Sequence, residues 1–172
     1  SNLGKIVSTS FADFVPSRNC PVIHSKKVTD FQSPWFVADP FLYIDEADVF
    51  HLFFEIGSQH HVQTPDAVIG HATSHDQGGT WEYDRIALDL GYHVSFPFVF
   101  EAGGRLYMIP EYDAGPETAV TLYARRDSMT SWQKRRHLVE PEFKPNDTIV
   151  FEYRNRWWML TNDSSTHSLH CY

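Results

Sequence analysis

Three stretches of the chain share one order of apolar and polar positions, over residues 37–55, 95–111 and 147–162. Each stretch begins with a short run rich in aromatic and aliphatic residues. It continues through a turn that contains Gly, Asp or Asn and ends in a second such run. Runs of this composition on both sides of a tight turn are typical of β-hairpins. We therefore predict one antiparallel hairpin in each stretch.

Each hairpin is followed by more strand-like sequence. A third apolar segment follows at residues 68–73, 120–125 and 168–172, and in the first two units a Trp-led fourth segment follows at residues 81–88 and 132–139. One unit is therefore four strands and about 50 residues long, as in β-propellers. We predict an all-β chain, residues 1–172, that forms a single β-propeller domain with about 2.5–3 four-stranded antiparallel blades. The predicted blades span about residues 35–89, 90–140 and 141–172.

The two ends of the chain fit the repeat less well. Residues 1–34 predict one or two short strands, at Lys5–Ser8 and Pro21–His24, together with loops. The third unit lacks a fourth strand, and an unpaired strand edge invites association. Residues 1–34 could supply the closing strand, a second copy could complete the ring as a homodimer, or the sequence could be a fragment. We favour the homodimer, because two copies of about 2.5 blades make about five.

A turn motif supports the same arrangement. Residues Ser74–Trp81 match the Asp-box pattern Ser-x-Asp-x-Gly-x-Thr-Trp, which resembles the turn between the third and fourth strands of sialidase blades. In such a turn the Asp carboxylate accepts backbone N–H bonds, a glycine takes a positive φ and the tryptophan packs under the blade. Residues Arg126–Trp132 look like a degraded counterpart in the second unit. The motif is a folding device and predicts no catalytic residue.

Composition and charge narrow the classes of partner. The formal net charge of −8 repels phosphate backbones, so we expect no nucleic acid. No apolar run approaches the roughly 20 residues that cross a bilayer, so we expect no membrane partner. The sequence assigns no compartment. The two cysteines, Cys20 and Cys171, could be two buried thiols or a bridge between the chain ends.

The ten histidines raise the question of a metal site. The densest groups are His60-His61 and the pair His71 and His75. Adjacent strand residues point to opposite faces, and no spacing in the chain matches a metal-ligand template. We therefore predict no metal and no cofactor. The alternative is a central ion or water cluster in the channel, held by acidic or His side chains.

Six segments of the chain resemble a known family. They are Val37–Leu42, His51–Glu55, Ile69–Ser74, Ser95–Phe100, Tyr107–Glu111 and Trp157–Met159. They look like the N-terminal propeller domain of plant glucosamine inositolphosphorylceramide transferases and bacterial relatives, and the resemblance covers about residues 20–172. That domain is similar to the five-bladed propellers of arabinanase- and invertase-like glycosidases. The resemblance implies a ring that needs about two more blades than this chain holds.

Candidate site residues follow from the repeat. The first strand of each blade lines the central channel of a propeller, so side chains at matching positions converge at one mouth. One column holds Asp39, Phe96 and Asp147, and the next holds Glu55, Glu111 and Asn162. The resemblance to the glycosidases implies that an Asp in the place of Asp39 is the base or nucleophile and that a Glu from a later blade is the acid.

We predict Asp39 and Glu111 as the catalytic pair, with Asp147 as a third carboxylate that orients or tunes them. Each of these carboxylates also has a structural interpretation, as the cap of a turn or strand or as a solvated group at a strand end. Phe96 stands where a second channel carboxylate is expected, which weakens the case for catalysis.

The predicted substrate-binding residues are Trp35, Glu55, Tyr92, His93 and Phe96. The indole of Trp35 and the phenol of Tyr92 would stack on sugar faces, and His93 would enter the same mouth.

Three functions are compatible with the sequence. The leading hypothesis is a carbohydrate-active, glycosidase-like propeller, a glycoside hydrolase that cleaves a glycan or oligosaccharide with paired carboxylates. The second is a non-catalytic glycan-binding or scaffolding module. The third is a sialidase-like Asp-box protein, although no arginine cluster for a sugar carboxylate is identifiable. Carboxylates that converge at an open mouth favour hydrolysis, whereas an aromatic plug around Phe96 favours binding.

Overall fold

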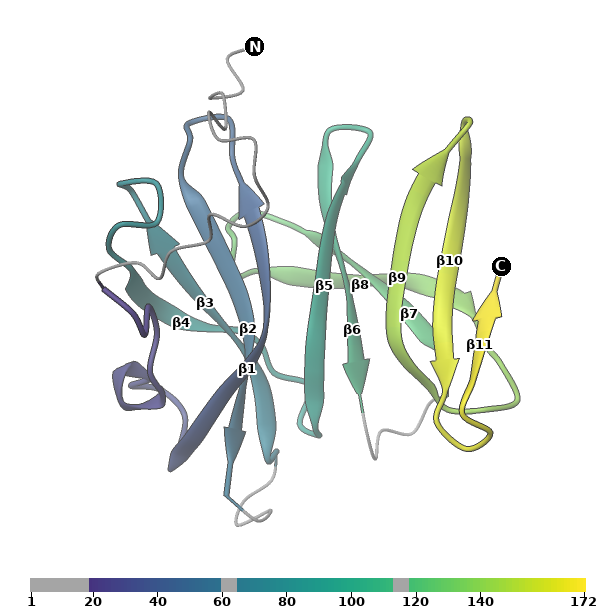
Figure 1. Ribbon diagram of the computed structural model, residues 1–172, viewed down its shortest axis with the longest axis horizontal. Coiled ribbons are helices and arrows are strands. Elements are labelled where there is room, and N and C mark those ends of the chain that lie inside the picture. The colour runs from purple at the N-terminus through teal and green to yellow at the C-terminus, as the bar shows by residue number, and fades with distance from the viewer. Residues whose placement is uncertain (1–18, 60–64, 113–117) are drawn as a thin grey trace, which may run out of the picture.

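The computed structural model describes residues 19–59, 65–112 and 118–172, and these fold into three antiparallel sheets that stand side by side like the blades of a fan (Figure 1). Blade 1 consists of β1 (Pro34–Ile44), β2 (Phe50–Ser58), β3 (Ala67–Ser74) and β4 (Glu82–Leu88). Blade 2 consists of β5 (Val94–Ala102), β6 (Arg105–Tyr112), β7 (Val120–Arg125) and β8 (Trp132–Val139). Blade 3 consists of β9 (Pro145–Tyr153), β10 (Arg156–Asp163) and β11 (Ser168–Cys171). Consecutive strands pair in every sheet, so the predicted all-β propeller class is confirmed.

The three inner strands share one backbone irregularity. Asp39 in β1, Phe96 in β5 and Asp147 in β9 have positive φ values of 49°, 43° and 51°. The pairing of each inner strand with the next strand shifts register at this point, as in a β-bulge. A bulge bends its strand and re-aims a side chain. The same bulge at the same repeat position places the three residues of the predicted column equivalently in their blades.

Buried side chains fill the two interfaces between blades. Phe53 and Ile69 of blade 1 pack with Val94, Met108 and Tyr123 of blade 2. A second cluster joins blades 2 and 3 through Ile109, Val120 and Met159. Full burial of a side chain of this size contributes about 1.5–3 kcal/mol. Packing between blades therefore fixes the relative positions of the inner strands.

The described part of the N-terminal segment covers blade 1 and adds no strand. Residues 21–24 were expected to form a strand, but they form bends ahead of the 3-10 helix η1 (Ser25–Lys27). The physical reasons are that Pro21 has no N–H to donate to a ladder and that the His24 ring accepts a hydrogen bond from the backbone N–H of Lys26, 3.1 Å away. The strand expected at Lys5–Ser8 lies outside the described residues.

The N-terminal segment instead packs on one face and one edge of blade 1. Ile23 and Val28 join a buried cluster with Phe54 and three further residues of blade 1. Asp30 accepts hydrogen bonds from the Tyr83 hydroxyl and from the backbone N–H of Ile86, both on β4. Because β4 is the outer strand of its sheet, this contact occupies part of an edge that would otherwise be open to pairing.

The turn between β3 and β4 is organised by one carboxylate. The Asp76 carboxylate accepts hydrogen bonds from the Thr80 backbone N–H at 2.7 Å and from the hydroxyls of Thr80 and Ser74 at 2.8 Å. These bonds, first among them that from the Thr80 N–H, hold the pKa of Asp76 at about 2. Gly78 takes the expected positive φ, and the Trp81 indole donates to the Gly78 carbonyl at 3.2 Å.

The corresponding turn of blade 2 keeps only part of this arrangement. The Trp132 indole donates to the Met129 carbonyl at 2.9 Å, as Trp81 does to Gly78. The side chain of Asp127 is 87% exposed, and its carboxylate lies 4.0 Å from the Arg126 guanidinium. The hydrogen bond from the tryptophan indole to a turn carbonyl is therefore common to both turns. Of the two turns, only that of blade 1 is organised by a carboxylate.

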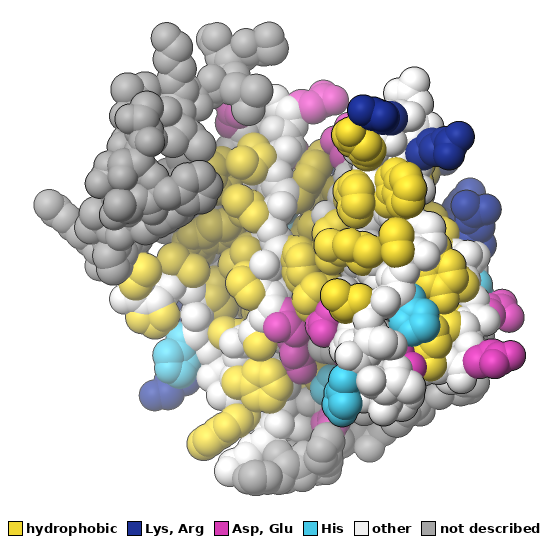
Figure 2. All heavy atoms as spheres, turned by 45° about the vertical axis from the view of Figure 1, so that its right-hand side comes forward, with side chains coloured by type: hydrophobic (Ala, Val, Ile, Leu, Met, Phe, Trp, Pro, Cys, Tyr) yellow, Lys and Arg dark blue, Asp and Glu magenta, His cyan; other side chains and the backbone are white. Residues whose placement is uncertain are grey.

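The outer face of blade 3 is apolar and exposed, and Figure 2 shows hydrophobic side chains gathered on this side of the molecule. Phe151 and Trp158 lie opposite each other in register and are 43% and 37% exposed. Their counterparts in blade 2, Phe100 and Tyr107, are also a register pair, and Phe100 contacts Trp157 of blade 3. The exposed face of blade 3 therefore resembles the face of blade 2 that packs against blade 3.

Neither alternative expected for the cysteines is correct. Cys20 and Cys171 are both free, and both are exposed. One precedes η1 beside blade 1 and the other lies on β11 of blade 3, so the two stand at opposite ends of the fan (Figure 1). Among the described residues, no helix has the length and apolar character needed to span a membrane.

Two histidines link two carboxylates through the interior of blade 1. The outer ring nitrogens of His51 and His71 lie 3.2 Å from Asp45 and Asp84, respectively, and the inner nitrogens of the two rings lie 3.1 Å apart. Burial, the largest cause, lowers the pKa of His71 to about 4, so this ring is neutral near neutral pH.

We predict that replacing His71 changes the pH dependence of stability. The pKa of His71 is about 4 in the folded chain and about 6.5 when unfolded, so the folded state loses stability as the pH falls from 6.5 toward 4. This loss amounts to about 3 kcal/mol at about 1.4 kcal/mol per pKa unit. Urea unfolding at several pH values should show the loss in the parent chain and not in His71→Gln. The exposed His75→Gln is the control, and equal pH slopes for all three proteins would contradict this role.

Candidate functional site

Four carboxylates from three blades lie at one end of the inner strands. Glu55 of β2 is the register neighbour of Ala38, next to Asp39 on β1. Glu111 of β6 contacts β9, where it accepts a hydrogen bond from the backbone N–H of Asp147 at 2.9 Å. Asp39 and Glu111 both act electrostatically on Glu55, and Asp147 acts on Glu111. The structure therefore brings together the carboxylates that the repeat predicted to converge.

Glu55 is the most perturbed group of this cluster. Its side chain is 9% exposed, and burial raises its pKa to about 7, with further contributions from the charge of Asp39, from a hydrogen bond to Asp39 and from the charge of Glu111. Two adjacent carboxyl groups with little access to water do not both ionise at low cost. Below about pH 7 Glu55 is therefore protonated and can donate a hydrogen bond to Asp39.

Glu111 has a different environment, although it too is buried. Its Oε1 accepts a hydrogen bond from the Asn146 amide, and its Oε2 accepts the bond from the Asp147 N–H. Burial raises the pKa of Glu111, and these hydrogen bonds oppose the rise. Both oxygens accept bonds from β9, so the side chain joins blade 2 to blade 3.

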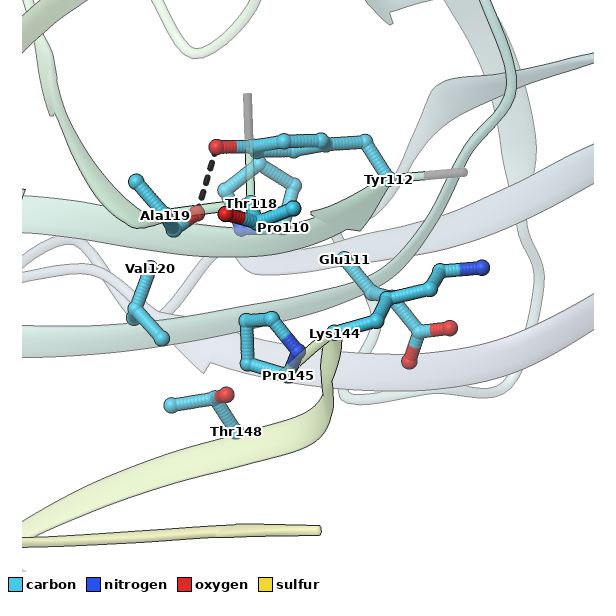
Figure 3. A pocket seen from close by; sticks show the side chains of 9 residues that line it. All are labelled: Pro110, Glu111, Tyr112, Thr118, Ala119, Val120, Lys144, Pro145 and Thr148. Carbon is cyan, nitrogen blue, oxygen red and sulfur yellow. Dashed lines mark hydrogen bonds between the residues drawn. The ribbon is translucent and has the colours of Figure 1, made fainter. Parts of the chain in front are cut away.

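A small hollow lies beside Glu111, between β6 and β9. Figure 3 shows Pro145 and Thr148 on the β9 side, and Glu111 and Lys144 extending to the same side of the hollow. Its volume of about 20 Å³ accommodates about one water molecule and no sugar ring. The hollow is therefore not a glycan subsite, and the carboxylate cluster remains the candidate site.

His93 and Asp66 complete the cluster on the side of Glu55. His93 directly precedes β5, and its Nε2 lies 3.7 Å from Glu55 Oε1. Its Nδ1 lies 3.0 Å from Asp66 Oδ1, and Asp66 directly precedes β3. His93 was predicted at this mouth, whereas Asp66 was not. Asp66 occupies no repeated position, so no sequence pattern could have indicated it.

The predicted aromatic residues take different places. Trp35 is 62% exposed at the beginning of β1, four residues before Asp39. Phe96 packs edge-on against Phe41 with ring centroids 4.9 Å apart, so the blade 2 position of the column is apolar. The ring of Tyr92 packs against Tyr112 of blade 2 with centroids 5.8 Å apart.

The close contact at Gly57 and the placement of potential metal ligands affect which groups the mouth could bind. A Cβ atom at Gly57 would lie 2.0 Å from the ring of Phe36, so only glycine allows this ring to lie over β2 next to Trp35. In the described ranges, no group of three or more His, Cys, Asp or Glu side chains is arranged to hold a metal ion. His60 and His61 lie outside these ranges, and His71 is committed to His51 and Asp84.

Comparison with known proteins identifies relatives of this chain. Residues 8–171 match the family model described as glucosamine inositolphosphorylceramide transferase 1, N-terminal. The enzyme of that name from Oryza sativa subsp. japonica is 38% identical over 135 residues, 78% of this chain and 17% of the relative. The Arabidopsis thaliana enzyme is 35% identical over 144 residues, 83% of this chain and 18% of the relative. The chain thus spans under a fifth of the length of these curated relatives.

Solved structures show the same fold. An endo-arabinase from Bacteroides thetaiotaomicron superimposes with a TM-score of 0.57 at 17% identity, over 80% of this chain and 55% of that chain. A Bacillus subtilis arabinanase superimposes with a TM-score of 0.55 at 11% identity, over 78% of this chain and 48% of that chain. The resemblance predicted from the sequence motifs is confirmed, both for the family and for the arabinanase-type propeller.

We predict that Glu55→Gln changes the pH dependence of stability in the opposite sense to His71→Gln. A carboxyl group with a raised folded pKa stabilises the fold below its unfolded pKa, and this contribution is lost as the pH rises through about 7. Glutamine cannot ionise, so the variant should gain stability relative to the parent chain, by up to about 3 kcal/mol, between pH 4.5 and pH 8. Denaturant unfolding measures the difference. The exposed Glu152→Gln is the control, and identical profiles for both variants would refute the buried protonated carboxyl.

Proposed function

The chain belongs to the glucosamine inositolphosphorylceramide transferase N-terminal family, and on this premise we propose that its carboxylate mouth binds a glycan. The relatives are named for a glucosamine transferase and the structural neighbours for arabinan cleavage, so both comparisons concern carbohydrates. The observation that carries the proposal is the convergence of Asp39, Glu55 and His93, with the exposed Trp35 at the beginning of β1.

The chemistry of this cluster suits a sugar. Carboxylates accept hydrogen bonds from vicinal hydroxyls, and an ionised Asp39 also suits the ammonium group of an amino sugar. Exposed aromatic rings give an apolar surface for a sugar face, and Trp35 is 62% exposed. A mouth with several acidic groups disfavours acidic sugars, since unpaired like charges repel.

Glycan binding should depend on Asp39 and Trp35. Calorimetric titration with glucosamine-terminated, N-acetylglucosamine-terminated and arabinan oligosaccharides should identify a ligand. Asp39→Asn should weaken its binding tenfold or more, because a hydrogen bond to a charged group contributes about 1.5–3 kcal/mol. Trp35→Ala should weaken it about fivefold, or about 1 kcal/mol. Asp127→Asn, an exposed carboxylate on blade 2, is the control, and the proposal fails if no sugar binds or if Asp39→Asn binds like the parent chain.

Glycoside hydrolysis is the second candidate, favoured by the proton that Glu55 and Asp39 share. In this mechanism Glu55 gives its proton to the glycosidic oxygen, the bond from that oxygen to the anomeric carbon breaks, and water adds to the carbon as its proton passes to Asp39. The step requires the two carboxyl groups, which contact each other in this structure, to separate to about 6.5–9.5 Å around the substrate. Both oxygens of Glu111 already accept hydrogen bonds from blade 3, so Glu55 suits the acid role better than the Glu111 expected from the sequence. Asp147 then acts only through the hydrogen bond from its backbone to Glu111.

The same oligosaccharides separate hydrolysis from binding. Turnover that Glu55→Gln abolishes while sugar binding persists would support hydrolysis. Binding without release of product from any of the three substrates would leave a binding module. A sialidase-like function has less support, because no arginine within the described ranges forms an ion pair with Asp39, Glu55 or Glu111. The turn at Ser74–Trp81 remains a proposed Asp-box on the basis of its sequence and hydrogen bonds.

We further propose that a second copy of this chain covers the apolar face of blade 3. The chain spans 55% and 48% of the two arabinanase-type structures, so two copies supply about the material of one ring. Phe41 and Tyr43 contact blade 2, so Leu42 and Ile44 point to the other face of blade 1. Ile23 and Val28 cover Phe54 on that face but leave Leu42 and Ile44 49% and 45% exposed. Two such contacts between blade 3 and blade 1 close a symmetric dimer.

Sedimentation equilibrium of the 172-residue chain should give twice the chain mass. Trp158→Glu should return it to one chain mass, because the charge would be buried in an apolar interface. Arg136→Glu on β8 should leave the dimer intact. A strict monomer, or an open series of higher oligomers, would contradict the closed pair.

A further inference from the structure

Glu55 has a second polar neighbour besides Asp39. His93 approaches it from the segment ahead of β5 with its Nε2 3.7 Å from Glu55 Oε1, and Asp66 holds the other ring nitrogen at 3.0 Å. The three residues come from separate segments of the chain, in β2, before β3 and before β5. His93 converges with Asp39 and Glu55 at the proposed glycan site, but neither it nor Asp66 takes part in a proton transfer there.

The Asp66 contact fixes how the His93 ring is used. A carboxylate beside Nδ1 accepts its N–H, which leaves the lone pair of the neutral ring on Nε2. This lone pair is therefore on the nitrogen that faces Glu55, the group that carries the shared proton. The arrangement pairs a proton donor with an oriented proton acceptor.

The side chains of Glu55, Asp66 and His93 differ in their exposure to solvent. The side chain of Glu55 is 9% exposed, that of Asp66 is 14% exposed and that of His93 is 29% exposed. The buried carboxyl group therefore has a more accessible base beside it.

We propose that Asp66 and His93 form a proton relay that exchanges the proton of Glu55 with solvent. The O–H bond of Glu55 breaks as an N–H bond forms at His93 Nε2, which leaves a carboxylate and an imidazolium. Solvent water then removes the proton from the imidazolium, and the reverse steps restore it to Glu55. A small rotation of the Glu55 side chain would shorten the 3.7 Å separation between Nε2 and Oε1 to hydrogen-bond distance.

The charges around the relay favour this exchange. Asp39 on β1 and Glu111 on β6 both act on Glu55, and Asp66 lies against the far side of the His93 ring. An imidazolium at His93 would thus form next to carboxylates, which stabilise it. His93 and Asp66 are positioning residues in this account, since they act on the sugar only through Glu55. The relay would serve the proposed glycan site, so its purpose rests on that proposal. Its proton transfer can be measured without any sugar.

Nuclear magnetic resonance titration of the full chain tests the relay. The carboxyl ¹³C signal of Glu55 and the ring ¹⁵N signals of His93 are followed against pH without ligand. In the parent chain the two groups should titrate as a coupled pair, with steps seen by both probes. His93→Gln should move the Glu55 midpoint by about one pH unit or more, and Asp66→Asn should shift the His93 ring toward the other tautomer.

Glu140→Gln is the matched control, because it removes another histidine–carboxylate contact, with His137 Nδ1 2.7 Å from Glu140 at the end of β8. It should leave the Glu55 curve unchanged. A Glu55 curve that is the same in the parent chain, His93→Gln and Asp66→Asn would overturn the relay and leave glycan binding standing. Coupled titration in a chain that binds no sugar would support the relay and sink the proposed function.

Discussion

The left-handed backbone at one position of each inner strand is the constraint on which this structure depends. Asp39, Phe96 and Asp147 hold φ values of 43–51°, a region that costs most residues about 1–3 kcal/mol. Aspartate enters this region more readily than other residues, but a phenylalanine does so only when its surroundings hold it there. The edge-on contact of Phe96 with Phe41 of blade 1 supplies such a hold. Packing between blades therefore maintains the bulges, and the bulges set the wall of the channel.

The chemistry of the site follows from this geometry. The bulge brings Asp39 against Glu55, and burial raises the pKa of Glu55 to about 7. Glu111 starts from the equivalent strand of blade 2 but meets Asn146 and the backbone of Asp147, which satisfy both of its oxygens. These hydrogen bonds oppose the rise in pKa that burial causes at Glu111. Equivalent positions of one repeat thus have different environments, because their polar neighbours differ.

Much of this could be predicted from the sequence, because the features involved repeat. The hairpins, the blade order and the column of Asp39, Phe96 and Asp147 follow from a period of two within strands and of about 50 residues between units. Features that occur once left no such signal. The N-terminal segment was expected to form a strand at Pro21–His24 but turns into η1, where the His24 ring caps the backbone. Asp66 acts through a contact with His93 that is 27 residues distant in sequence.

The protonation of the site could not be predicted from the sequence either, because it depends on burial and on distances between blades. Infrared difference spectroscopy between the parent chain and Glu55→Gln at pH 6 measures it most directly, with glutamate carboxyls labelled with ¹³C. The account predicts that the parent chain shows the C=O stretch of one protonated glutamic acid that the variant lacks. A parent spectrum with only carboxylate bands at that pH would show that Glu55 and Asp39 hold no common proton.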